Sequence, residues 1–171
     1  MPDDANTTTD DERYFTIKGR RWRRTDPSIP ETLRQQLVDE LMNARRAVKA
    51  AKASGVEEEM RAARARVQDA KVALGERGQP PWWEVPTDAS LDERLTATIR
   101  CLLRHRDSGK TICPSEAARV VDGDEWRELM TRTREVAWQL EADGWLIVTQ
   151  RGERVRPPVK GAIRLQRVEA D

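Results

Sequence analysis

Apolar positions recur every three or four residues across two stretches of the first half of the chain. The first stretch, from Glu31 to about Ala53, carries Leu37, Leu41, Ala44, Val48 and Ala51. The second carries Met60, Ala63, Val67, Ala70 and Leu74. These spacings predict two helices with coiled-coil seams. Because only about two residues join them, the seams can bury each other only by folding back, which predicts an antiparallel helical hairpin.

Short β-prone runs precede these helices. Tyr14 to Ile17 and the segment around Trp22 flank Gly19, which predicts a β-hairpin. Residues 1–12 are polar and acidic without periodicity, which predicts a disordered tail. Between the helices, Ser54 and Glu57 have the spacing of a capping box.

The second half begins a new pattern at Ser90, the expected N-cap of a helix that ends near His105. A short β-like run, residues 111–113, leads into a helix that starts at Pro114. A third helix is expected from about Asp124 to Asp143, followed by strands at 145–150 and 162–167. This order of elements is that of a winged helix-turn-helix domain.

The patterns together predict an α+β fold that is mostly α. We expect a disordered tail at 1–12, a β-hairpin plus helical hairpin at 13–78, and a winged-helix domain at 90–168. The segment 79–89, with Pro80, Pro81, Trp82 and Trp83, is expected to connect the two parts.

Three separated motifs add a resemblance. The run GKTICPSEAAR (109–119), Trp126 and the run KGAIRLQR (160–167) resemble a bacterial family of domains of unknown function. The resemblance covers about residues 90–168 and implies a winged-helix fold. The first half, with GRRWR, DPSIPETLRQ and VQDAKVALGERGQPPWW, resembles small bacterial proteins labelled biopolymer transporter Tol. No residue pattern here supports the function in that label.

Composition narrows the setting. The 171 residues are 37% hydrophobic and 36% charged, with a net charge of only +1, so any attraction to a polyanion must be local. No apolar run is long enough to cross a bilayer and no export signal opens the chain, so we expect no membrane contact and a cytoplasmic protein. Cys101 and Cys113 are expected to be free thiols.

The main candidate for function is the basic loop, residues 151–161, between the last two strands. From Gly144 to Val168 there are six cations against one acid, Glu153. In winged helices this loop, the wing, commonly contacts the phosphate backbone. The expected nucleic-acid contacts are Arg151, Arg154, Arg156 and Lys160, and the expected partner is double-stranded DNA.

The third helix gives divided evidence. Arg127, Thr131 and Arg134 fall on one stripe that could support such contacts. Asp124, Glu125 and Glu128 at its start would repel phosphates. We include Arg127 and Arg134 among the candidate nucleic-acid-binding residues.

The alternative hypothesis is a protein-interaction module. Its contact surface would be the helical hairpin, through self-association or a protein partner, together with Trp82 and Trp83 of the connector. Trp22 lies among four arginines and is a further candidate for contact with nucleic acid.

Catalytic chemistry has little support in the sequence. His105 is the only histidine, and Cys101, His105 and Cys113 do not have the spacing of a metal site. We therefore predict no enzyme activity, no catalytic or metal-binding residue and no cofactor.

Overall fold

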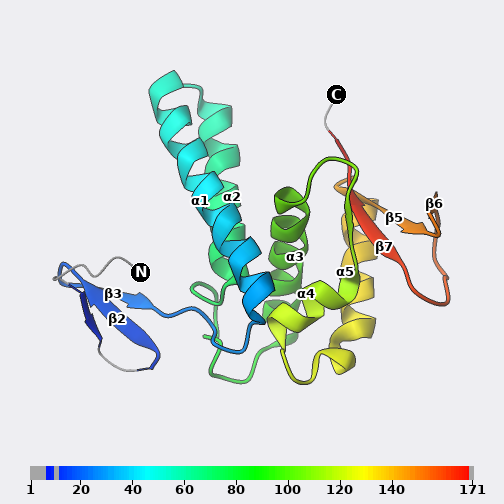
Figure 1. The fold of residues 1–171 in the computed structure, drawn as a ribbon, viewed down its shortest axis with the longest axis horizontal. Helices are drawn as coiled ribbons and strands as arrows, with labels where there is room; N and C mark the ends of the chain where they lie inside the picture. Colours follow the sequence, from blue (N-terminus) through cyan, green and yellow to red (C-terminus); the bar gives the residue numbers. More distant parts are fainter. Residues whose placement is uncertain (1–6, 10–11, 170–171) are drawn as a thin grey trace.

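The computed structural model describes residues 7–9 and 12–169 (Figure 1). The first half contains β1 (Thr7–Thr9), β2 (Tyr14–Ile17), β3 (Arg20–Arg23), α1 (Glu31–Ser54) and α2 (Glu57–Ala73). The second half contains α3 (Asp88–His105), β4 (Thr111–Ile112), α4 (Pro114–Val121), the 3₁₀ helix η1 (Trp126–Leu129), α5 (Met130–Ala142), β5 (Leu146–Gln150), β6 (Glu153–Arg154) and β7 (Arg164–Arg167). The predicted class, α+β and mostly α, is confirmed.

A small antiparallel sheet opens the chain, in the order β1-β2-β3. The predicted β-hairpin is β2 and β3, which are joined by Lys18 and Gly19 with φ of 49° and 75°. Such left-handed pairs suit the twist of a tight hairpin. The sequence predicts no strand in residues 1–12, but Thr7–Thr9 form β1 because three β-branched residues add readily to an open edge. The rest of that predicted tail lies outside the described residues, apart from Glu12.

The predicted helical hairpin is α1 and α2. Its interior contains Leu37 and Leu41 together with alanines from both helices, which let the backbones approach closely: Ala44, Ala51, Ala63 and Ala70. Figure 1 shows the pair running antiparallel, with its tip projecting from the rest of the molecule.

Two predicted helix caps are wrong. Ser54 does not cap α2, because α1 continues through it and ends at Gly55, whose φ is 71°. The N-cap of α2 is Val56, without a side-chain cap. Helix α3 begins at a Thr87 cap rather than at Ser90, because Ser90 is the reciprocal partner. Its amide donates to Thr87 Oγ1 at 3.1 Å, and its own Oγ accepts from the Thr87 amide at 2.9 Å.

The second half builds a sheet in the order β4-β7-β5-β6, with α4 and α5 packed on α3. The predicted third helix starts later than expected. Asp122 Oδ1 accepts from the Glu125 amide, so a turn precedes the helix; residues 126–129 are then 3₁₀, and the α-helix begins only at Met130.

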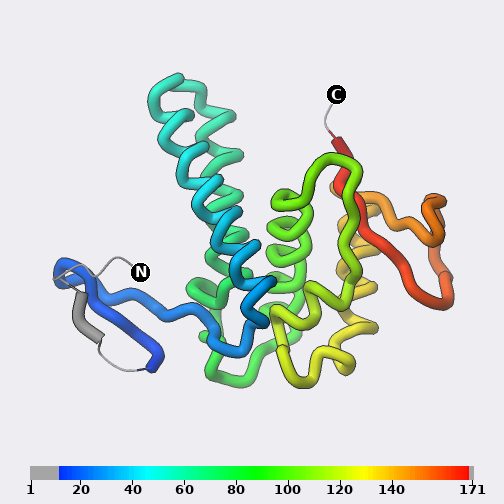
Figure 2. The backbone as a smooth tube through the Cα atoms, viewed as in Figure 1, coloured from blue at the N-terminus to red at the C-terminus, as the bar shows by residue number. Residues whose placement is uncertain are grey.

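One hydrophobic cluster joins the two halves. It contains Leu37 and Leu74 of the first half and Leu102 and Leu165 of the second. Gly123 shows how closely the halves approach, because a Cβ there would lie 2.5 Å from the carbonyl oxygen of Ser28. The tube in Figure 2 shows α3 placed between the helical hairpin and the C-terminal elements. Within the described ranges, no helix has the length and apolar character needed to span a bilayer.

Candidate nucleic-acid interface

The basic loop grows out of the antiparallel pair of β5 and β7. Leu146, Val148 and Leu165 point into the core, which fixes the register of both strands. Beyond Gln150 the chain turns at Arg151 and Gly152, with φ of 53° and 82°, and pairs briefly as β6. The loop therefore projects from one end of this sheet, at the edge of the molecule (Figure 1).

Two side chains hold the backbone of this loop. The Arg134 guanidinium of α5 donates to the carbonyl oxygens of Val159 at 2.8 Å and Gly161 at 2.9 Å. Gln150 Nε2 donates to those of Lys160 at 2.8 Å and Ala162 at 3.2 Å. Four successive carbonyls are thus satisfied by two side chains, so the loop has a defined shape. The sequence pattern does not predict this role for Gln150, because the role depends on a loop that returns beside it.

The cations of the loop differ in their availability. Arg151, Arg156 and Lys160 are exposed, and within the part of the chain that the structure describes their side chains make no ion pair. Arg154 is 55% exposed and lies 3.2 Å from Glu141 Oε1, so its charge is partly balanced. Arg164 is hydrogen-bonded to the hydroxyl and carbonyl oxygens of Thr111, which leave its positive charge uncompensated.

Helix η1 and the start of α5 present a different surface. The guanidinium of Arg127 lies 4.5 Å from the ring centroid of Trp126, and Arg119 lies at the same distance. Asp124, Glu125 and Glu128 are exposed there. The predicted stripe is therefore divided, with Arg127 packed on an aromatic ring and Arg134 bound to the basic loop.

The similarity to a known protein family lies in this second half. Residues 92–168 match the family model described as Protein of unknown function (DUF3253). No curated protein matches the chain. The match runs from the first turns of α3 to the end of β7, so it includes the basic loop and η1.

Trp82 and Trp83 lie before the matched region and contact the N-terminal segment. Trp82 Nε1 donates to the carbonyl oxygen of Arg24 at 3.0 Å. The Trp83 ring meets Trp82 edge-on at 5.1 Å and Tyr14 at 5.3 Å. Both rings are half-buried, so the connector is packed against β2 and the segment that follows β3.

A cleft of about 340 Å³ lies beside the connector. Its walls include Trp82 and the ion pair between Arg94 and Asp26, whose nitrogen and oxygen are 2.9 Å apart. Arg94 also donates to backbone carbonyl oxygens of Ala73 and Val120. Asp26 and Arg94 are therefore already paired with each other, and the cleft is also lined by the exposed acids Glu84 and Glu93.

The remaining residues that could take part in catalysis or bind a metal are His105, Cys101 and Cys113. His105 Nε2 lies 3.3 Å from Asp39 Oδ2. Cys101 is a free, buried thiol whose pKa is raised by burial, and Cys113 is a free, half-buried thiol. Among the described residues, no three His, Cys, Asp or Glu side chains gather as a metal site would require.

Proposed function

We propose that the chain is a non-catalytic DNA-binding protein whose second half is a winged helix. The order helix, strand, helix, helix, strand, loop, strand supports this assignment. The basic loop is the wing in this proposal, and Arg151, Arg154, Arg156 and Lys160 contact the phosphates of a DNA duplex.

One observation carries the proposal: unpaired cations stand on a loop whose backbone is already held in place. Ordering a flexible loop would cost conformational entropy on binding, and the hydrogen bonds from Arg134 and Gln150 reduce that cost. Arg151, Arg156 and Lys160 are then free to displace counterions from the DNA backbone.

The acids around η1 limit the mode of binding. Glu125 and Glu128 would lie close to phosphates if the start of this helix entered the major groove, and that contact is repulsive. We therefore assign binding to the basic loop and expect backbone contacts without strong base preference. In this arrangement Arg134 positions the loop and Arg127 stays on Trp126.

The test is fluorescence anisotropy with a random duplex of about 20 base pairs at low and moderate salt. Replacing Arg151, Arg154, Arg156 and Lys160 together by Gln should weaken binding at least tenfold. The plot of log K against log salt should also become less steep, by up to about 3.6 in slope, or about 0.9 for each phosphate that the variant no longer neutralises.

The control replaces four exposed cations of the helical hairpin, Arg46, Lys49, Lys52 and Arg61, by Gln. It makes the same change in net charge. Equal weakening by both variants, or no effect of the loop variant, would show that the basic loop is not the DNA-binding surface.

The protein-interaction alternative receives less support. Trp82 and Trp83 make ring and hydrogen-bond contacts with Tyr14 and Arg24 of this chain, so the connector packs against the N-terminal segment. If Trp82→Ala with Trp83→Ala abolished binding to a protein partner without loss of folding, the alternative would replace the first proposal.

A further inference from the structure

The sheet at the other end of the molecule has an aromatic face that the proposed function does not use. Phe15 of β2 pairs directly with Trp22 of β3, and Ile17 pairs with Arg20. Directly paired residues point to the same side of an antiparallel sheet, so these four side chains share one face. We name it the Phe15/Trp22 face.

This face is not part of the hydrophobic core. Phe15 and Trp22 are half-buried, and neither belongs to the buried cluster or packs against it. A small sheet is normally stabilised by burying one face. Two large, half-buried rings outside the core on adjacent strands therefore form a surface suited to a planar ligand.

The charge around the face selects an anionic ligand. Arg20 lies on this face, whereas Arg21 and Arg23 lie on the other face of the sheet, over Tyr14 and Trp83. The guanidinium of Arg20 lies 4.5 Å from the centroid of the Trp22 ring. Arg20 is exposed, and an exposed cation–π contact is weaker than stacking of a base on an aromatic ring. A base can therefore replace Arg20 on the ring while Arg20 turns to a phosphate.

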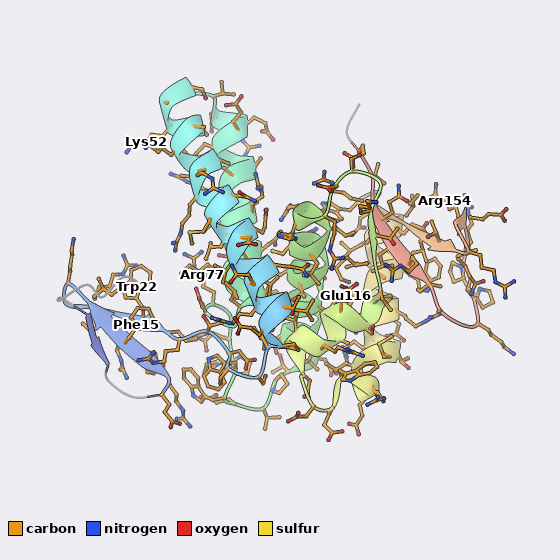
Figure 3. The ribbon with its side chains drawn as sticks, viewed as in Figure 1. Phe15, Trp22, Lys52, Arg77, Glu116 and Arg154 are labelled. Carbon is orange, nitrogen blue, oxygen red and sulfur yellow. The ribbon has the colours of Figure 1, made fainter. Side chains whose placement is uncertain are left out.

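A basic path leads from this face onto the helical hairpin. Lys71 Nζ lies 5.3 Å from the Trp22 ring centroid, and its charge is paired with Glu76 Oε2 at 2.9 Å. The Arg77 amide donates to the Lys71 carbonyl oxygen, and the Arg77 side chain is exposed. Arg77 also lines an open groove along α1 and α2, together with Arg45 and Arg64. The floor of the groove includes Val48, Ala65 and Val67. In Figure 3, Trp22 of β3 and Arg77, which follows α2, are labelled on neighbouring parts of the molecule.

We propose that the Phe15/Trp22 face and the adjoining groove bind single-stranded nucleic acid. Bases stack on Phe15 and Trp22, and the phosphates that follow contact Arg77, Arg64 and Arg45. Aromatic rings flanked by a track of cations match such a strand, because its bases are unpaired and free to stack. A duplex keeps its bases stacked inside and could use only the cations. This site lies at the opposite end of the molecule from the basic loop (Figure 1) and does not depend on the function proposed for that loop.

The first experiment uses the unchanged full-length chain. Fluorescein-labelled dT₁₅ and the same oligonucleotide with three central abasic positions are compared by anisotropy. The loss of stacking should weaken binding about tenfold or more. Equal affinity for the two oligonucleotides would overturn the stacking contact, because the phosphates are the same in both.

The second experiment removes the rings. Phe15→Leu with Trp22→Leu should weaken dT₁₅ binding about tenfold or more while the far-ultraviolet circular dichroism stays unchanged. The matched control is Trp126→Leu, which removes a half-buried ring that also lies between two arginines but belongs to the other half. An equal effect of the control would contradict the proposal, as would full binding by the double variant.

The third experiment tests the groove without disturbing the small sheet. Arg45→Gln with Arg64→Gln should lower the salt slope for dT₁₅ by about 1.4, or about 0.7 for each phosphate contact. The control pair, Arg46→Gln with Arg61→Gln, makes the same charge change on the same helices and should leave the slope unchanged. A slope that is the same in all three proteins would remove the groove from the site.

The two sets of variants distinguish this site from the basic loop. The Gln variant of the basic loop should keep its affinity for dT₁₅, and the Leu variant of the Phe15/Trp22 face should keep its affinity for the duplex. If the unchanged chain bound dT₁₅ but not the duplex, the proposed function would be rejected and this site would stand. If the loop variant failed to bind dT₁₅, the separate site would be rejected.

Discussion

Arg134 has a role that its residue type alone does not reveal. The sequence places it on a stripe with Arg127 and suggests contact with nucleic acid. In the structure its guanidinium is directed at the carbonyl oxygens of Val159 and Gly161. An arginine on a helix face predicts an anion or an acceptor as partner, but only the path of a distant loop determines which acceptor is near.

Arg134→Ala should loosen the basic loop. Two hydrogen bonds from a charged donor are removed, and the unfolding free energy should fall by about 1–2 kcal/mol in urea denaturation. Trypsin should cleave faster after Lys160, and duplex binding should weaken. Arg132→Ala is the control, because Arg132 pairs with Asp88 and Asp92 away from the loop. A cleavage rate after Lys160 that is unchanged by Arg134→Ala would mean that Gln150 is sufficient to hold the loop.

The helical hairpin illustrates what an apolar pattern predicts and what it misses. Leu37, Leu41 and Ala44 of the predicted seam are buried as expected. Glu40, which the pattern treats as polar and outward, is only 1% exposed and receives hydrogen bonds from Arg66 at 2.8 and 3.1 Å. These hydrogen bonds raise the pKa of Arg66. The spacing of apolar residues predicts which residues of α1 face α2. It does not predict that α3 also covers a second side of α1.

Replacing only Arg66 should lower the free energy of unfolding more than replacing both Arg66 and Glu40. Arg66→Met leaves the Glu40 carboxylate buried without its partner, and we expect the unfolding free energy to fall by about 3 kcal/mol. Glu40→Met with Arg66→Met should recover most of that loss, because no unpaired charge remains. Urea denaturation of the three proteins gives both values. Arg61→Met, at an exposed pair with Glu58, is the control; a double variant as unstable as Arg66→Met alone would mean that packing, rather than charge, determines the loss.

The whole molecule is joined by a core that crosses the predicted connector. Leu74 and Leu95, on either side of residues 79–89, belong to the same buried cluster. The ion pair of Asp26 with Arg94 has side chains only 6% and 15% exposed, and Arg104 Nη1 lies 2.7 Å from Asp69 Oδ2. These contacts couple the folding of the two halves.

The full chain should therefore unfold in one transition. Calorimetric and van't Hoff enthalpies should agree, and tryptophan fluorescence and far-ultraviolet circular dichroism should give the same midpoint in urea. Two resolved transitions would show that the halves fold independently, as the composition of residues 79–89 suggests from the sequence.

The sequence by itself determined the local elements. Period, turn residues and prolines are properties of neighbouring positions, and they predicted the β-hairpin, the helical hairpin and the order of elements in the second half. They also located the four arginines around Trp22 and the cations between Gly144 and Val168. The caps at Ser54 and Ser90 were misplaced because several nearby polar residues could serve, and small energies select among them.

Only the tertiary structure decided which surfaces stay open. Long-range packing joined the halves through Leu74 and Leu95, and it placed Trp82 and Trp83 on the N-terminal segment. It also left the rings of Phe15 and Trp22 only half-buried, outside the core. The exposure of a side chain depends on every element packed around it, and that sum cannot be read from spacing along the chain.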